Sequence, residues 1–362
     1  MKRTLNNIPS LLIVLLMSFG LPACEQRVLE DIEYSHYVRV YIDDNIPNIT
    51  EDIYNDQYAR PELEIPEVMR IMLCNPASGD MVADRYLQNK GKDERGLYFD
   101  GYVGAPAGDY NLMVYNFDTE YTQVENSNNF DKIHAYTNPV SSSYRNKYAQ
   151  LTSGLGEGDL LYAPNHLYTT ICRNIPVSLT SEIDTLYDAR GDFFTASSQV
   201  ESIFLKVRIR GVQWISSIGA VITGMSPTID LEDGKLSKDA VCIPLSIRCV
   251  VSDSTTLNRS RTQSNAQEAT AYTVFNTFGK ALGESPVTVK FEFIKTDGSS
   301  QVEEIDITSL FKSSDFIQNN WILIDRDIQI KPSEFINSGE DGSGGFIPTV
   351  DDWNDVIIDI II

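Results

Sequence analysis

The residues best suited to chemistry in this chain are three histidines and a large number of carboxylates. His36, His134 and His166 stand far apart, and none belongs to an HExxH or HxH pattern that would present two imidazoles to a metal. No GxSxG or cysteine-protease signature supplies an activated nucleophile. We interpret each histidine as a surface or half-buried residue, and we predict no catalytic residue, no metal site and no cofactor.

The carboxylates leave two kinds of site open. With 51 Asp and Glu residues, a glycosidase-like pair cannot be singled out from the sequence. Two acidic groups could offer oxygen ligands to calcium, but neither completes a calcium-binding loop, and we interpret both as solvated loops. These groups are Asp351, Asp352 and Asp355, and Asp43, Asp44 and Asn45.

The overall charge argues against a nucleic-acid partner. The formal net charge is −22, and no basic stripe offsets it. Such a surface repels phosphate backbones. We therefore expect no binding of nucleic acid.

The first residues predict export and a lipid anchor. Lys2 and Arg3 precede an apolar run over residues 8–21, which is too short for a stable membrane span and is typical of a secretory signal. The run ends in LPAC (21–24), which resembles the lipobox of bacterial lipoproteins. That resemblance implies removal of residues 1–23 and acylation of Cys24, with palmitate among its chains. An ordinary signal, cleaved after Ala23 with Cys24 free, is the alternative.

Four more cysteines follow Cys24, at positions 74, 172, 242 and 249. None has metal-ligand spacing. Cys242 and Cys249 would point to opposite faces if they shared one strand. We interpret all four as buried apolar residues, and a disulfide stays open because exported proteins permit one.

Short stretches with a period of two predict a mainly β protein. The clearest stretches are YVRVYID (37–43), IFLKVRIRGV (203–212) and VTVKFEF (287–293). Each places apolar side chains on one face and polar ones on the other, so we expect one core face and one wet face. DYNLMVYNFD (109–118) is apolar on both faces and predicts a central strand.

The chain length and the pattern of turns predict two antiparallel β-sandwiches in tandem. We expect a signal peptide over 1–23, a lipidated tether over 24–36, an N-terminal sandwich over 37–180 and a C-terminal one over 181–362. The boundary lies within 176–200, where residues 181–200 show only short helical or loop signals. Acidic residues 47–67 and the glycine-rich 337–345 form long connections.

Aromatic residues offer a second kind of binding site. YFDGY (98–102), Tyr110, Tyr115 and Phe117 could form a platform that stacks on sugar rings, although in a β-rich chain such rings usually belong to the core. Carbohydrate binding is therefore the alternative function.

Several longer stretches resemble one family, the fimbrillin-like (Mfa-like) outer-membrane lipoproteins of the Bacteroidetes, which are related to type V pili. The stretches are SIGAVITGMSPTIDLEDGKLS (217–237), TVFNTFGKALGESPVTVKFEFIKTDGS (273–299) and GGFIPTVDDWNDVIIDIII (344–362). The motifs carry no catalytic residue. FNTFG (275–279) and TGM (223–225) look like packing features.

The resemblance implies two transthyretin-like sandwiches and a non-enzymatic role in a pilus at the cell surface, as an anchor or accessory subunit. Its partners would be the outer membrane, through the lipid, and pilin subunits, through strand exchange. A stalk subunit of this kind loses its first strand to a protease, and Arg60 is the candidate cleavage site. An anchor keeps that strand, and we favour the uncut form. A stand-alone lipoprotein that binds glycan or a host protein is the alternative.

The final residues predict one more strand, 353–362. Val356, Ile358, Ile360 and Ile362 share one face of it. Such a strand either closes the second sandwich or acts as a donor strand for a neighbouring subunit.

Overall fold

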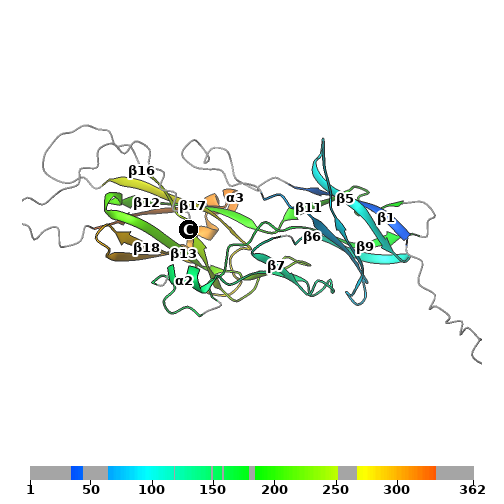
Figure 1. Ribbon diagram of the computed structural model, residues 1–362, viewed down its shortest axis with the longest axis horizontal. Helices are drawn as coiled ribbons and strands as arrows, with labels where there is room; N and C mark the ends of the chain where they lie inside the picture. The colour runs from blue at the N-terminus through cyan, green and yellow to red at the C-terminus, as the bar shows by residue number, and fades with distance from the viewer. Residues whose placement is uncertain are drawn as a thin grey trace, which may run out of the picture.

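The computed structural model describes residues 34–43, 64–117, 119–147, 150–156, 159–178, 184–251 and 267–331. Strands dominate these residues, and two groups of strands follow one another along the long axis of the molecule (Figure 1). We call the group from β1 to β11 the first region and the group from β12 to β20 the second region.

The first region is built on one nine-stranded sheet. Its order is β3-β2-β6-β9-β11-β1-β5-β4, and β10 also pairs with β1. The bounds are β1 (Tyr34–Ile42), β2 (Met69–Cys74), β3 (Met81–Leu87), β4 (Asn89–Asp93), β5 (Gly96–Ala105), β6 (Gly108–Asn116), β9 (Tyr168–Val177), β10 (Asp184–Thr185) and β11 (Phe194–Ser198).

This sheet folds over on itself and encloses a single core. Core side chains come from both of its halves, with Val40 and Phe99 from one half packed with Ile71 and Leu112 from the other. β11 joins the halves, because it pairs with β1 at one end and with β9 at the other. The result is a sandwich, in which β6 lies between β2 and β9 as the predicted central strand.

The second region consists of two four-stranded sheets, ordered β16-β17-β12-β20 and β15-β13-β18-β19. Their inner faces share a core that includes Leu205, Ile222, Phe291 and Ile324. The bounds are β12 (Glu201–Arg210), β13 (Ile215–Met225), β15 (Val241–Leu245), β16 (Arg248–Val251), β17 (Glu268–Thr277), β18 (Thr288–Lys295), β19 (Ser300–Asp306) and β20 (Trp321–Gln329).

Short helices lie between these strands. They are α2 (Ser142–Lys147), α3 (Ser314–Asn319) and the 3-10 turns η1 (Val212–Trp214) and η2 (Thr308–Lys312). The Ser313 hydroxyl caps α3 by accepting a hydrogen bond from the Phe316 amide. In the described part of the chain, no helix is long and apolar enough to cross a membrane.

Backbone pairing and buried side chains join the two regions. A three-stranded sheet pairs β7 (Thr122–Glu125) and β8 (His134–Thr137) with β14 (Thr228–Asp230), which follows β13 in the chain. Around it, Phe130, Leu167, Ile229 and Phe278 form a core to which both regions contribute. A β-bridge between Leu160 and Cys242 adds a second connection.

The structure confirms the mainly β fold, and it corrects the prediction for residues 181–200. β1, β6, β12 and β18 coincide with the four predicted strands to within a few residues. Residues 194–198, however, form β11, in which Phe194 and Ala196 are buried while Thr195 and Ser197 are exposed. This alternation covers only five residues, which is too short to stand out from the flanking loop. β10 and β11 both pair with the first region's sheet, and the two-domain division stays a prediction.

The cysteine and motif predictions have mixed outcomes. Cys74, Cys172, Cys242 and Cys249 are free thiols, and Cys74 and Cys242 are buried. The prediction that all four are buried is wrong for Cys172 and Cys249, which are partly exposed; Cys242 and Cys249 lie on two different strands, β15 and β16. The FNTFG and TGM stretches do serve packing. Phe275 and Phe278 are buried, and Gly224 adopts a φ of +83° where a Cβ would meet the Pro286 carbonyl oxygen at 2.8 Å.

Candidate functional site

Because the family resemblance makes the first strand decisive for function, the site is built around β1. β1 lies inside the sheet, with neighbours on both sides. It pairs antiparallel with β5 over eight residues, from Tyr34 opposite Ala105 to Tyr41 opposite Tyr98. On its other side it pairs in parallel with β10 and then with β11. Both backbone edges of β1 are therefore hydrogen-bonded.

The inner face of β1 contributes His36, Val38, Val40 and Ile42 to the interior. His36 is completely buried, and neither of its ring nitrogens has a hydrogen-bond partner. Burial lowers the pKa of His36 below its usual value, and the negative charge of Asp184 opposes this shift. The imidazole is therefore kept neutral inside the sandwich.

The prediction of surface or half-buried histidines is thus wrong for His36 and for His166, which is only 6% exposed. His36 continues the inward alternation of Val38 and Val40, so its position in the pattern was the available signal. His134, on β8, is partly exposed as predicted.

The outer face of β1 is organised around Arg39. Its guanidinium donates to the carboxylates of Asp93 at 3.4 Å and Asp100 at 3.3 Å, and its Nε donates to the Tyr37 hydroxyl at 3.0 Å. The guanidinium also lies 3.9 Å from the centre of the Tyr98 ring, a close cation–π contact. We call these five residues the Arg39 clamp.

Two phenol groups of β1, Tyr37 within the clamp and Tyr41 beside it, bind the carboxylates of the clamp. Tyr37 donates to Asp100 at 2.6 Å, and Tyr41 donates to Asp93 at 2.8 Å. Burial and the hydrogen bond to Asp100 raise the pKa of Tyr37 to about 12. The hydrogen bond from Tyr41 lowers the pKa of Asp93. The network therefore favours a neutral Tyr37 phenol and a charged Asp93 carboxylate.

These contacts correct the prediction that this face of β1 is simply wet. The Arg39 side chain is only 23% exposed, and Tyr41 is 4% exposed. Sequence alternation identified the face as polar, but the partners of Arg39 depend on the cross-strand register with β5 and β4, which alternation does not give. The composition of YFDGY was the one available signal for aromatic and acidic partners.

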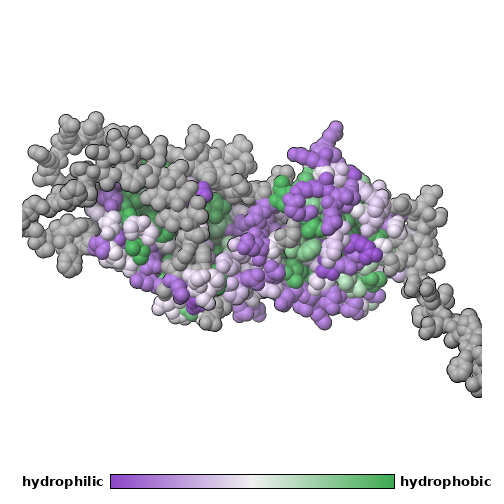
Figure 2. Space-filling model, in the orientation of Figure 1, coloured by the Kyte–Doolittle hydropathy of each residue, from purple (hydrophilic) through white to green (hydrophobic). Residues whose placement is uncertain are grey.

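The aromatic residues proposed for a sugar platform divide between core and surface. Phe99, Tyr110 and Tyr115 are buried. Tyr102 is 53% exposed and packs edge-on against Tyr37, while Phe117 is 39% exposed and packs against Tyr86. On the face shown in Figure 2, the described surface of the first region is mainly hydrophilic, with small hydrophobic patches.

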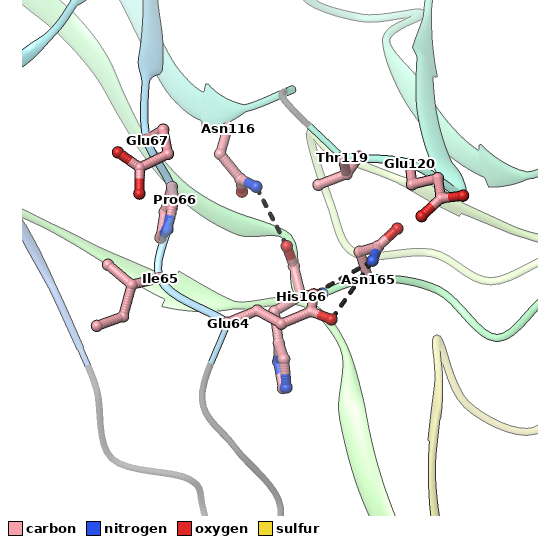
Figure 3. Close-up of a pocket in the computed structure, with 9 residues that line it drawn as sticks. All are labelled: Glu64, Ile65, Pro66, Glu67, Asn116, Thr119, Glu120, Asn165 and His166. Carbon is pink, nitrogen blue, oxygen red and sulfur yellow. Dashed lines mark hydrogen bonds between the residues drawn. The ribbon is translucent and has the colours of Figure 1, made fainter. Parts of the chain in front are cut away.

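A second feature lies where the chain enters β2. Glu64 points toward Asn165 and His166 across a cleft of about 290 Å³ (Figure 3). Its carboxylate accepts hydrogen bonds from the His166 amide at 3.1 Å and from the Asn165 side chain at 3.3 Å. Asn116 donates to the His166 carbonyl and accepts from the Tyr168 amide. Glu64 therefore fastens the segment that precedes β2.

Neither this cleft nor its surroundings offers a metal site. Glu64, Glu67 and Glu120 line the cleft. Within the residues that the structure describes, no group of three histidine, cysteine or acidic side chains could hold a metal ion. The geometry instead gives Glu64 a structural role.

The remaining predicted sites lie outside the described residues. They are the lipidation site Cys24, the cleavage site Arg60 and the strand residues Val356, Ile358, Ile360 and Ile362. The last strand among the described residues is β20, which pairs in parallel with β12 and is an edge strand among the described strands.

Comparison with solved structures defines the class of fold. The crystal structure of a "putative adhesin" from Bacteroides ovatus superposes with a TM-score of 0.52, at 18% identity over 82% of this chain and 93% of that one. The fimbrial anchor protein Mfa2 from Porphyromonas gingivalis aligns over 82% of this chain and 90% of that one, at 9% identity and a TM-score of 0.42. The B. ovatus structure shows that the chain shares the fold of that protein.

Comparison of sequences then gives the family. A family model described as "Domain of unknown function (DUF5119)" matches residues 52–246, and the chain belongs to this family. A curated relative, "Putative fimbrium anchoring subunit Fim4B" of B. ovatus, is 22% identical over 308 residues, which is 80% of this chain and 83% of that protein. The resemblance to fimbrial proteins that the sequence indicates is confirmed.

Proposed function

We propose that this protein is a lipid-anchored, non-enzymatic anchor or accessory subunit of a fimbrillin-type pilus on the outer membrane. In this role Cys24 carries the lipid, the first strand stays in place, and pilin subunits bind by strand addition. The relative named as a putative fimbrium anchoring subunit supports an anchoring role. The domains are the two sandwiches, divided between β11 and β12.

The Arg39 clamp is the observation that carries the proposal. A stalk subunit has to release its first strand, whereas an anchor keeps it. Leaving this sheet would cost β1 its pairing with β5, β10 and β11 and would leave the carboxylates of Asp93 and Asp100 without the Arg39 charge. Asp100, whose side chain is 17% exposed, is the partly buried carboxylate that this loss would destabilise. This arrangement favours a β1 that stays.

The second region supplies an edge for strand addition. β20 has one paired side among the described strands. The terminal strand 353–362 either closes the chain's own sandwich there or is donated to a neighbour. An extended strand gains a generic hydrogen-bond ladder from such an edge and specificity from alternate side chains.

The mature N-terminus tests the anchor role. The protein is purified from native membranes and its first residue is determined by mass spectrometry. The proposal predicts an acylated Cys24 and an uncut Arg60, and Cys24→Ser should move the protein out of the membrane fraction. A mature chain that begins near Pro61 would overturn the anchor role.

Deletion of residues 353–362 tests strand addition separately. If the segment is a donor strand, the monomer keeps its melting temperature and loses only its association with pilin. If it closes the second sandwich, the melting temperature of the monomer falls. An unchanged melting curve together with unchanged association would contradict both roles.

A further inference from the structure

A second cleft lies where two strands of the first region separate. β9 and β11 pair only at Thr169 with Ser197 and at Tyr168 with Ser198. Beyond these pairs, β11 follows β1 while β9 follows β6. A cleft of about 260 Å³ fills the gap between them.

One wall of this cleft is aromatic. Phe193 lines it, and the Tyr187 ring lies 5.4 Å from the Phe193 ring, centre to centre. Tyr187 is 43% exposed, so the pair extends from the cleft to the surface. Exposed aromatic rings of this kind combine an apolar face with a polar tip and suit ligands that are themselves amphipathic.

The lining also includes Thr170, Ile171, Cys172 and Thr195, and its charged groups are balanced. Arg95, Arg190, Asp188 and Asp192 contribute two positive and two negative side chains. Arg95 and Asp192 are paired at 2.8 Å, while no ion pair engages Arg190 among the described residues. Asp188 shapes the loop by accepting hydrogen bonds from the amides of Arg190 and Asp192.

This combination selects one class of ligand. A phosphate or carboxylate would face two aspartates, and a cation would face two arginines. A neutral polyhydroxyl compound can donate to the carboxylates and accept from the guanidinium groups, while its C–H face packs on an aromatic ring. The volume is below that of most drug-sized sites, which is appropriate to a single sugar ring.

We propose that the cleft between β9 and the β10–β11 connection binds a neutral saccharide unit, stacked on the Tyr187–Phe193 wall and hydrogen-bonded by Arg190 and its charged neighbours. This site is separate from the strand addition proposed above and would operate whether or not the protein belongs to a pilus.

Saturation-transfer NMR on the folded protein tests this site. The probes are D-glucose, D-galactose, D-mannose and N-acetyl-D-glucosamine, with D-glucuronate as the acidic comparison. We expect transfer to at least one neutral sugar and binding weakened about tenfold, as for the loss of one good contact, in Tyr187→Ala and in Arg190→Ala. Tyr86→Ala is the matched control, because Tyr86 is 55% exposed on β3 and packs against Phe117, whereas Tyr187 packs against the lining residue Phe193.

Three results would overturn the proposal. The first is no transfer to any neutral sugar, and the second is transfer to D-glucuronate alone. The third is equal weakening by Tyr187→Ala and by Tyr86→Ala while both variants keep the wild-type circular dichroism spectrum. Arg190→Ala changes an exposed side chain, so its loss of binding can be separated from any loss of folding.

Discussion

β1 in the first region and β20 in the second are both parallel to a neighbouring strand, yet they are held in different ways. β1 is paired on both sides, and the partly buried Arg39 clamp covers its outer face. β20 is paired on one side among the described strands. Its ion pairs join Asp327 to Arg208 and Arg210 of β12, and Arg326 to Glu303, and these three arginines are 42–58% exposed. Because backbone hydrogen bonds hold both strands, the difference between them lies in the number of paired sides and in the side chains.

The regions also differ in their polar interior. All three histidines belong to the first region or to the sheet that joins the regions, and His36 is buried there without a partner. In the described part of the second region, the buried carboxyl side chain is Glu292 on β18, and burial raises its pKa. Acid should therefore destabilise the first region through His36, because protonation of Glu292 does not favour unfolding of the second.

The largest expected effect tests whether the regions unfold together. Phe99→Ala and Phe291→Ala each remove a completely buried ring, one in each region, and each should cost about 3–5 kcal/mol of unfolding free energy. Because a shared core and the β8–β14 pairing join the regions, we expect both variants to lower one common transition in calorimetry. A new transition confined to the altered region would show that the regions unfold independently.

An intermediate effect sharpens the contrast between β1 and β20. Arg39→Ala removes the cation–π contact with Tyr98 and leaves the partly buried Asp100 without its cation, and we expect a loss of about 1–3 kcal/mol in urea unfolding. The matched change on β20, Arg326→Ala, should cost less than about 1 kcal/mol because its ion pair is exposed.

Arg39→Lys checks that geometry matters as well as charge. Lysine lacks the planar fork that reaches two carboxylates and lies flat on Tyr98, so it should restore only part of the lost stability. Equal losses for Arg39→Ala and Arg326→Ala would remove the contrast between the strands.

The smallest effect concerns pH. The pKa of His36 is lowered in the folded state, so below pH 6.5 the unfolded chain binds the proton more readily, and stability falls as pH decreases. Asp184 opposes this shift. His36→Leu should flatten the decline between pH 7 and 5 by up to about 1.4 kcal/mol per pH unit, measured by urea unfolding at each pH.

His134→Leu on β8 is the control for this pH series, because His134 is partly exposed and lies outside the sandwich. The same decline in the wild type and in His36→Leu would exclude His36 as its source.

The sequence predicted the long strands well and the short ones poorly. Val38 and Val40 in β1, and Leu205 and Val207 in β12, repeat over enough residues for alternation to mark the core face. β11 offers only Phe194 and Ala196. Its position between β1 and β9 is set by long-range pairing, which a local pattern does not contain.

The Arg39 clamp could not be predicted from the sequence for a related reason. Tyr37, Arg39 and Tyr41 could be placed on one face from their spacing, but Asp93 and Asp100 come from β4 and β5, and their alignment depends on register. The proposed saccharide cleft could not be predicted from the sequence either, because it exists only where β9 and β11 diverge in the folded chain. The spacing of residues along one strand predicts which face of the strand they share. Their contacts with residues on other strands can be known only from the folded topology.

The β8–β14 pairing has a mechanical consequence. The two regions follow one another along the long axis (Figure 1), and β8 and β14 connect them by backbone hydrogen bonds beside the buried rings of Phe130 and Phe278. A tensile load that pulls the regions apart has to break this ladder and expose these rings to water in the same step. The junction between the two regions therefore resists extension. We expect it to transmit force from one region to the other with little bending.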